Sequence, residues 1–169
     1  MIRVVVNSTP LIALSITGRL PLLKALFDEV IVPASVYEEV VLYGQGRPGA
    51  EKVEKADWIV VKEPKERPSL PPALLGLGQG EIDVILLAQE LKADRVLIDE
   101  KLGRKIADTL GLHVKGTLGI LLAAYHIRLL SQGEAEEVVE ALATSSVRVS
   151  PRLVRWFRAQ LAVGRRERK

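Results

Sequence analysis

Cysteine is absent from this sequence, and histidine occurs only twice. Without cysteine there is neither a disulfide framework nor a thiolate metal site, and this composition is compatible with a reducing compartment. Aromatic residues make up only 4% of the chain, so the core must be built from aliphatic side chains. The longest apolar runs are too short to span a membrane, and no signal peptide is recognisable. We therefore expect a cytoplasmic globular protein without a membrane segment.

Neither sign of charge dominates, since the formal net charge is only +3 at pH 7. This balance alone does not indicate a nucleic-acid partner. The distribution of positive charge along the sequence is more informative, because the chain ends in the basic sequence RRERK and arginines recur at 152, 155 and 158. A chain of 169 residues fits one domain with a substantial core. We expect a main domain over residues 1–130 and a helical extension of the same domain, with a basic tail, over residues 131–169.

Short aliphatic runs alternate along the chain with segments of helical composition. Residues 2–6 are β-branched and aliphatic, which is typical of a fully buried strand. Cap signals predict helix starts at Thr9 before Pro10, at Ser35, and at Ser150 before Pro151. Strands that alternate with helices pair in parallel, which predicts a three-layer α/β sandwich with a central parallel sheet of about five strands and additional C-terminal helices. The other strands are expected at EVIVP, WIVVKEP, DRVLIDE and LHV.

Polar residues follow these predicted strands where a single site would form. Ligand sites in open parallel sheets lie beyond the carboxyl ends of the strands, where the strand order reverses. The candidates are Asn7, Ser8 and Thr9 after the first strand, Asp99 and Glu100 after the fourth, Glu81 at a helix start, and Glu38 or Glu39 after the second strand. Nearly all are acids, and acids gathered in one place need a cation. Hard oxygen ligands favour Mg²⁺ or Mn²⁺, and such ions are suited to cutting a phosphodiester.

Each of these residues also has a purely structural interpretation. Asp99 and Glu100 are favoured at the start of the helix that they precede, and Glu81 occupies a similar position. Asp83 is expected to be a solvated acid, and Asn7 is typical of a turn. The functional interpretation depends on convergence, since four separate strand or helix ends carry acid or amide side chains.

Other familiar motifs are absent. The sequence GLGQG follows a proline-rich connector rather than a strand and lacks the G-x-G-x-x-G spacing, which argues against dinucleotide binding. No P-loop or nucleophile elbow is present, and His113 and His126 are isolated. A receiver-like doubly wound domain would need an acid cluster after the first strand, where this chain has Asn7.

Four segments, in this order, resemble the PIN-domain ribonucleases: VVVNSTPLIAL, VPASVYEEVV, GQGEIDVILLAQEL and VLIDEKLGRKIADTLGLHVKGTLGILL. The resemblance covers residues 2–130 and is most specific from Asp99 to Leu122. The most similar branch consists of small prokaryotic proteins related to the toxins of type II toxin–antitoxin pairs. The resemblance implies a PIN-like sandwich with an acidic metal pocket, and Mg²⁺- or Mn²⁺-dependent cleavage of single-stranded or structured RNA.

The resemblance also implies roles for individual residues. Asn7 stands where family members typically have Asp, so the site has one anion fewer. The helix glutamate of the family corresponds to Glu39, with Glu38 as the alternative. The implied catalytic residues are Asn7, Glu39, Glu81 and Asp99, and the implied metal ligands are these four and Glu100. We expect RNA contacts from Thr9, Lys101 and Arg104 and, because of the charge of the tail, from Arg165 and Arg166.

Two functions remain open at this point. The first is an endoribonuclease of toxin type, with an RNA substrate, a small antitoxin as partner and a homodimeric state. The second is a PIN-fold module that binds RNA or protein, with Asn7 as the sign of lost chemistry. The last helix is open in the same way, because Trp156 and Phe157 belong either to the chain's own core or to a protein interface beside the basic tail.

Overall fold

The computed structural model of this protein describes residues 1–67, 74 and 76–165. The chain forms two compact units, Met1–Gly116 and Thr117–Lys169, and each is described by itself. The two units meet after Gly116, and the predicted main domain over residues 1–130 with its extension over 131–169 stays a prediction. None of the described helices is both long enough and apolar enough to cross a membrane.

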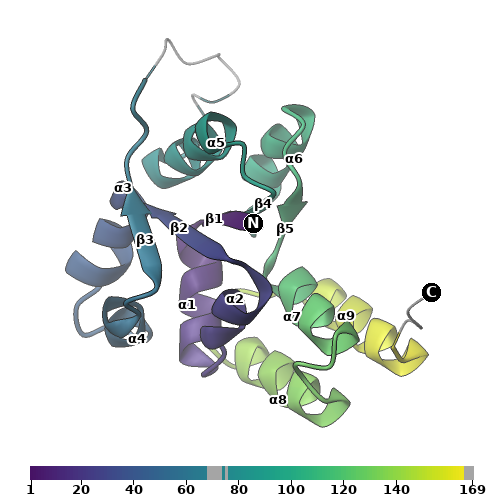
Figure 1. Cartoon of the computed structure of the whole chain (residues 1–169). Helices are drawn as coiled ribbons and strands as arrows, with labels where there is room; N and C mark the ends of the chain where they lie inside the picture. Colours follow the sequence, from purple (N-terminus) through teal and green to yellow (C-terminus); the bar gives the residue numbers. More distant parts are fainter. Residues whose placement is uncertain (68–73, 75, 166–169) are drawn as a thin grey trace. The chain divides into compact units, whose positions relative to one another are not determined.

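The first unit is built on a parallel sheet of β1 (Arg3–Val6), β2 (Glu29–Pro33), β3 (Ile59–Lys62), β4 (Arg95–Leu97) and β5 (Val114–Lys115). These five strands lie in the order β3-β2-β1-β4-β5 (Figure 1), which confirms the predicted parallel α/β sheet. β1 pairs with β2 on one side and with β4 on the other. Because it is central, Val4, Val5 and Val6 are completely buried, as the continuous aliphatic run predicted.

Helices cover both faces of this sheet: α1 (Ser8–Ile16), α2 (Pro21–Leu26), α3 (Ala34–Tyr37), the π-helical turn η1 (Glu38–Leu42), α4 (Ala50–Lys55), α5 (Gln79–Leu91) and α6 (Lys101–Thr109). Figure 1 shows α1 and α2 on one face and α5 and α6 on the other. α5 packs against β1, β2 and β4, and its residues from Glu81 to Ala88 are all buried. The unit is thus the predicted sandwich.

The strand order reverses beside β1. The chain leaves β1 towards β2 and β3 on one side and returns through α5 to β4 on the other side. The carboxyl ends of β1 and β4 therefore flank the place where open parallel sheets bind ligands. The backbone N–H of Asn7, directly after β1, donates to the carbonyl of Leu97 at 3.0 Å, so the two strand ends are joined there.

Two helix starts differ from the prediction. α1 begins at Ser8 with Asn7 in the cap position, although the sequence predicted Thr9 as the cap. Proline lacks an N–H and is tolerated throughout the first turn, so Pro10 does not fix the first helical residue. α3 begins at Ala34, which places Ser35 inside the first turn rather than at the cap.

The segment between residues 34 and 55 also contains structure that the sequence did not predict. The second half of the helix expected there is the π-helical turn η1. The short helix α4 follows Gly46 and Gly49, whose φ angles of 81° and 92° suit glycine. Only Ala50 and Val53 of α4 are buried, and two apolar positions are too few for a periodic signal.

In its described part, the second unit consists of α7 (Thr117–His126), α8 (Gln132–Ala143) and α9 (Pro151–Val163), which pack against one another. Ser131 and Glu134 form a capping box at the start of α8. The side chain of Ser150 caps α9 ahead of Pro151, as predicted. These caps satisfy backbone N–H groups that would otherwise lack partners.

The two aromatic residues of α9, Trp156 and Phe157, differ in their burial. Phe157 is completely buried, whereas Trp156 is 43% exposed. Phe157 is therefore a core residue, and only Trp156 is left for a contact outside the chain. Arg158 forms ion pairs with Glu136 and Glu140 of α8, so this arginine binds acids of its own unit.

Candidate functional site

Asn7 lies at the carboxyl end of β1 and is only 3% exposed. A capping role would engage its side chain in a local hydrogen bond. No such bond forms, although Asn7 occupies the cap position of α1. Its Oδ1 instead faces the start of α5, where a Cβ added at Gly80 would lie 3.6 Å away. The amide oxygen is therefore buried and directed at α5 rather than used for the turn.

Glu39 reaches the same place from η1. Its Oε2 would also lie 3.6 Å from a Cβ at Gly80, and Val36 Cγ2 would lie 3.1 Å from it. The missing side chain at Gly80 thus lets α5 approach α3 and η1 closely. Glu38, the alternative that the sequence left open, lines a neighbouring pocket instead. Of the two glutamates, Glu39 is the one that lies near Asn7.

Glu81 comes from the first turn of α5 and is 8% exposed. It accepts a backbone hydrogen bond from Gly78, but its Oε2 is buried without a hydrogen-bond partner in the described structure. Burial, together with the nearby carboxyls of Glu100 and Glu39, raises the pKa of Glu81 from 4.5 to about 7. A buried polar atom without a partner costs about 1–3 kcal/mol, and more when it is charged. This oxygen therefore marks a place for a proton or a cation.

The unpartnered oxygen of Glu81 faces α6. A Cβ at Gly103 would overlap Oε2 of Glu81 and would lie 3.1 Å from Cγ2 of Ile98, so a larger residue there would force the Glu81 carboxyl to shift. Glu100 occupies the cap position of α6 without a side-chain cap bond, and its carboxyl is close enough to that of Glu81 to raise the pKa of Glu81. The structure thus brings together four of the predicted site residues: Asn7, Glu39, Glu81 and Glu100.

Asp99 lies two residues beyond β4, beside Arg104 of α6. A Cβ at Gly116 would lie 2.7 Å from Oδ1 of Asp99 and 2.5 Å from Nη1 of Arg104. Both groups therefore pack over Gly116, with the carboxylate and the guanidinium next to each other. Asp99 is half-buried and Arg104 is exposed. Arg104 is thus a cationic side chain that stands beside a candidate acid.

As the side chains stand, no three of the described Asp, Glu and His residues are placed so that they could hold a metal ion together. The donor set nevertheless suits a hard divalent cation, because it consists of carboxylate and amide oxygens. The unpartnered Oε2 of Glu81 and the raised pKa of this carboxyl indicate a need for positive charge at the same place. The residues present therefore fit Mg²⁺ or Mn²⁺.

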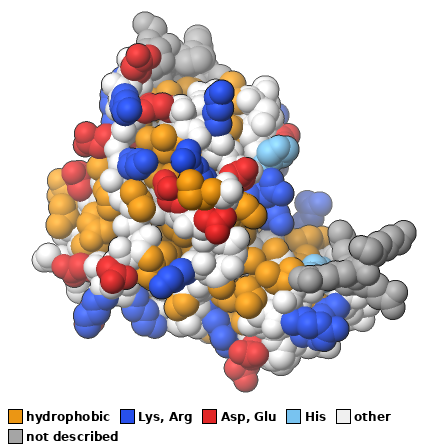
Figure 2. Space-filling model, in the orientation of Figure 1, with side chains coloured by type: hydrophobic (Ala, Val, Ile, Leu, Met, Phe, Trp, Pro, Cys, Tyr) orange, Lys and Arg blue, Asp and Glu red, His pale blue; other side chains and the backbone are white. Residues whose placement is uncertain are grey.

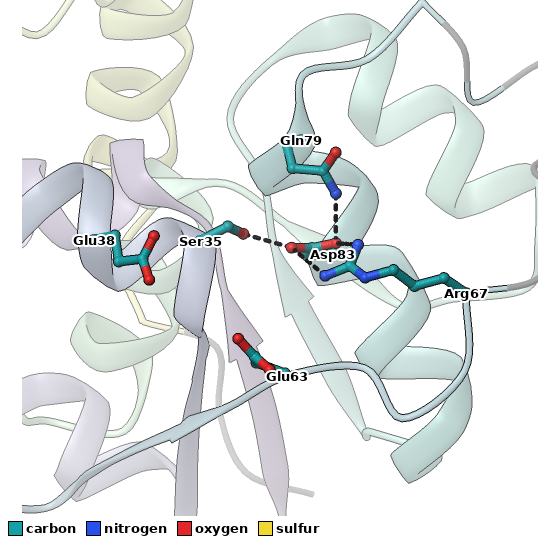
Figure 3. Close-up of a pocket in the computed structure, with 6 residues that line it drawn as sticks. All are labelled: Ser35, Glu38, Glu63, Arg67, Gln79 and Asp83. Carbon is teal, nitrogen blue, oxygen red and sulfur yellow. Dashed lines mark hydrogen bonds and ion pairs between the residues drawn. The ribbon is translucent and has the colours of Figure 1, made fainter.

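A pocket of about 400 Å³ opens next to this cluster, lined by Ser35, Glu38, Glu63, Arg67, Gln79 and Asp83 (Figure 3). Asp83, which the sequence suggested to be solvated, is 1% exposed. Ser35 Oγ and Arg67 Nη1 each donate to it at 2.6 Å, and Gln79 Nε2 donates at 2.9 Å. Burial by itself would raise the pKa of Asp83, but these donors outweigh burial and hold the pKa below its usual value.

The other predicted RNA contacts lie in different places. Thr9 is half-buried in the first turn of α1, and Lys101 is exposed at the start of α6. Arg165 donates to the carbonyls of Tyr125 and Leu130 and lies over the Tyr125 ring, 4.9 Å from its centroid. Its donors thus serve the second unit itself. Arg166 lies outside the described residues.

Basic side chains do not form one large patch on the face shown in Figure 2, where Lys and Arg are interspersed with Asp and Glu. This mixture agrees with the small net charge of +3. Affinity for a phosphate backbone usually comes from several clustered cations. On this face, a contact with RNA would therefore depend on individual side chains.

Comparison with known proteins identifies the family. The model of a PIN domain family (DUF3368) matches residues 3–162. No curated protein matches the chain. A PilT N-terminus domain protein from the hyperthermophilic archaeon Sulfolobus solfataricus P2 has a similar structure, with a TM-score of 0.52 and 16% identity over 73% of this chain and 93% of that one. A domain of a functionally unknown protein from Methanocaldococcus jannaschii DSM 2661 gives a TM-score of 0.41 and 23% identity over 69% of this chain and 91% of that one.

At these identities the structural similarity concerns the fold alone, and the second score is too low to support an argument. The family match is independent of them and extends over nearly the whole sequence. It also includes every residue of the acid cluster described above. This chain belongs to the PIN domain family.

Proposed function

We propose that this protein is a divalent-metal-dependent endoribonuclease. Its PIN domain has a nuclease-like fold. The observation that carries the proposal is the carboxyl of Glu81, which is buried, has an oxygen without a partner in the described structure, and has a pKa of about 7. It lies with Glu39, Glu100 and Asn7 at the edge of the sheet where the strand order reverses.

In this proposal Asn7, Glu39, Glu81 and Glu100, together with Asp99, hold Mg²⁺ or Mn²⁺. When bound, such an ion supplies a more acidic water molecule as nucleophile and neutralises charge on the phosphate. Glu81 holds a proton in part of the molecules near neutral pH, because its pKa is about 7. Loss of this proton turns Glu81 into an anionic ligand. Asn7 contributes a neutral carbonyl oxygen.

The chain's own cations orient the RNA. A phosphate brought close to several carboxylates is repelled unless a positive charge stands beside them. The guanidinium of Arg104, next to Asp99, supplies that charge, and Thr9 and Lys101 are further candidate contacts. A toxin paired with a small antitoxin, a homodimeric state and a cytoplasmic location remain predictions from the resemblance and the composition.

Binding of RNA or protein without catalysis is the second candidate function. Asn7 favours it, because an amide brings no charge where the resembling ribonucleases have Asp. The described acids also do not form a ready group of three ligands. A site with one charge fewer holds its cation less tightly and lowers the pKa of bound water less.

Calorimetric titration with Mn²⁺, combined with a cleavage assay, tests the proposal. We expect Mn²⁺ to bind, and a single-stranded RNA carrying a fluorophore and a quencher to be cut only when Mg²⁺ or Mn²⁺ is present. Glu81→Gln keeps the shape of the side chain but removes its charge, so affinity should fall roughly ten-fold or more. The matched control is Glu137→Gln, which removes an exposed acid of α8 and should change neither result. RNA binding without Mn²⁺ binding or cleavage would favour the second function.

A further inference from the structure

Asp83 is a buried acid that the proposed metal site does not use. Its carboxylate accepts hydrogen bonds from three side chains (Figure 3): Ser35 of α3, Arg67 of the segment after β3, and Gln79 of α5 itself. The ion pair with Arg67 compensates the buried charge, and Gln79 lies one helical turn before Asp83 on the same helix. These contacts make Asp83 a fixed point on α5.

Two of the connected segments carry candidate metal ligands. Ser35 lies four residues before Glu39 in the continuous helical segment formed by α3 and η1. Asp83 lies two residues after Glu81 on α5. The Ser35–Asp83 hydrogen bond of 2.6 Å therefore joins the helix that carries Glu39 to the helix that carries Glu81, within about one turn of both ligands.

This link matters because the helix around Glu39 is irregular. The N–H of Tyr43 donates to the carbonyl of Glu38, five residues earlier, at 2.8 Å. Such π-helical turns are rare, and their side-chain directions differ from those of a regular helix. The direction of Glu39 therefore depends on what holds α3 and η1 in place.

The contact at Gly80 does not by itself supply that constraint. Val36 Cγ2 packs against Gly80, which limits how closely α3 approaches α5. An apolar contact of this kind has little directionality, so the two helices could slide past each other at small cost. The hydrogen bond from Ser35 is directional and sets the relative position of the two helices.

We infer that Asp83 is a positioning residue, which acts through Ser35 to hold Glu39 beside Glu81 and Asn7, while Gln79 helps to orient its side chain and Arg67 compensates its buried charge. The inference rests on the proposed function, because the position of Glu39 relative to Glu81 matters only if both side chains bind the same ion. Asp83 itself touches neither the ion nor the RNA.

The test compares two variants that remove different partners of Asp83. Ser35→Ala removes the hydrogen bond between α3 and Asp83 but keeps the contacts of Asp83 with Arg67 and Gln79. Mn²⁺ affinity should therefore fall roughly ten-fold, which is typical when a group that orients a metal ligand is lost. Ser35→Thr keeps a hydroxyl and should restore binding. Arg67→Gln removes the ion pair but keeps the Ser35–Asp83 bond, so Mn²⁺ affinity should stay at the wild-type value or rise. Its melting temperature should nevertheless fall at least as far as that of Ser35→Ala.

A crystal structure of the metal-free Ser35→Ala variant provides a second readout. Glu39 should move away from Asn7 and Gly80 by about 1 Å or more, a displacement that is large for a catalytic or ligand group. Equal losses of Mn²⁺ affinity in Ser35→Ala and Arg67→Gln, or an unmoved Glu39, would overturn the inference. A wild-type protein that binds no Mn²⁺ would refute the proposed function, while the position of Glu39 in the variant crystal would still decide whether Asp83 acts on it.

Discussion

Replacing Gly103 by alanine tests whether the Glu81 carboxyl is held where the structure places it. Gly103 lies in the first turn of α6 and does not have a positive φ, so alanine needs no change of backbone. In a helix interior, alanine is favoured over glycine by roughly 0.8–1 kcal/mol. Here, however, the new methyl group would overlap Oε2 of Glu81 and lie within 3.1 Å of Cγ2 of Ile98.

These two effects oppose each other, and we expect the overlap to dominate. Adding a methyl group to a filled space costs about 1–3 kcal/mol. After subtraction of the helix preference, the free energy of unfolding should fall by about 0–2 kcal/mol. For a chain of this size, each kcal/mol lowers the melting temperature by about 2–4 °C. Because Glu81 is displaced, Mn²⁺ affinity should fall as well.

A double-mutant cycle with Glu81→Ala isolates the contact. In that background the methyl group has room on the side of Glu81, so Gly103→Ala should be neutral or stabilising, with a coupling energy of about 1–3 kcal/mol. Gly133 is the matched control, because it lies in the first turn of α8 and a Cβ there meets only Ser131 Oγ, at 3.9 Å. Urea unfolding of all variants gives the free energies. If Gly103→Ala stabilises the wild type as much as Gly133→Ala does, Glu81 moves aside freely and the idea of a fixed, unpartnered oxygen is wrong.

Three further predictions concern the same site. Because the pKa of Glu81 is raised, the folded state binds more protons than the unfolded state between pH 4.5 and about pH 7. The free energy of unfolding of the metal-free protein should therefore fall as the pH rises through this range. In urea unfolding, Glu81→Gln should make this dependence on pH weaker. Asn7→Asp adds a full charge and should tighten Mn²⁺ binding by about ten-fold or more in calorimetry; equal or weaker binding would argue against Asn7 as a ligand. Arg104→Gln should weaken RNA binding and reduce the salt slope of the binding constant by about one, with an unchanged melting temperature; an unchanged slope would place Arg104 away from the RNA.

The fold was predictable because two strong signals agree along the first unit. Continuous aliphatic runs such as Val4–Val6 indicate strands buried on both faces, and the amphipathic segments between them indicate crossover helices. Local boundaries were less predictable, since Thr9 and Ser35 carry cap-type hydroxyls but neither residue occupies the cap position of its helix. A hydroxyl signals that a partner is needed, but the partner of Ser35 is Asp83, 48 residues away. No local pattern contains that information.

The candidate site was predictable in its residue types but not in its contacts. Glu38 and Glu39 are neighbours in sequence, and only the π-helical turn and the approach of α5 at Gly80 bring Glu39 to Asn7. The roles of Gly80 and Gly103 depend on close packing between helices, which composition does not report. A glycine in the first turn of an otherwise regular helix is the one signal that could have indicated them, because its low helix propensity needs a compensating reason.

The amide at Asn7 is consistent with the crowding around Glu81. Without a cation, burial and the carboxyls of Glu100 and Glu39 already raise the pKa of Glu81, so a further carboxylate at position 7 would add repulsion. An amide avoids that repulsion and therefore stabilises the metal-free protein. It also means that the ion meets one negative charge fewer than it would with aspartate at this position. The Asn7→Asp variant should accordingly melt at a lower temperature than the wild type without metal, and this deficit should shrink or reverse in saturating Mn²⁺. A variant that melts higher in both conditions would show that repulsion among the acids is not what makes an amide suitable at this position.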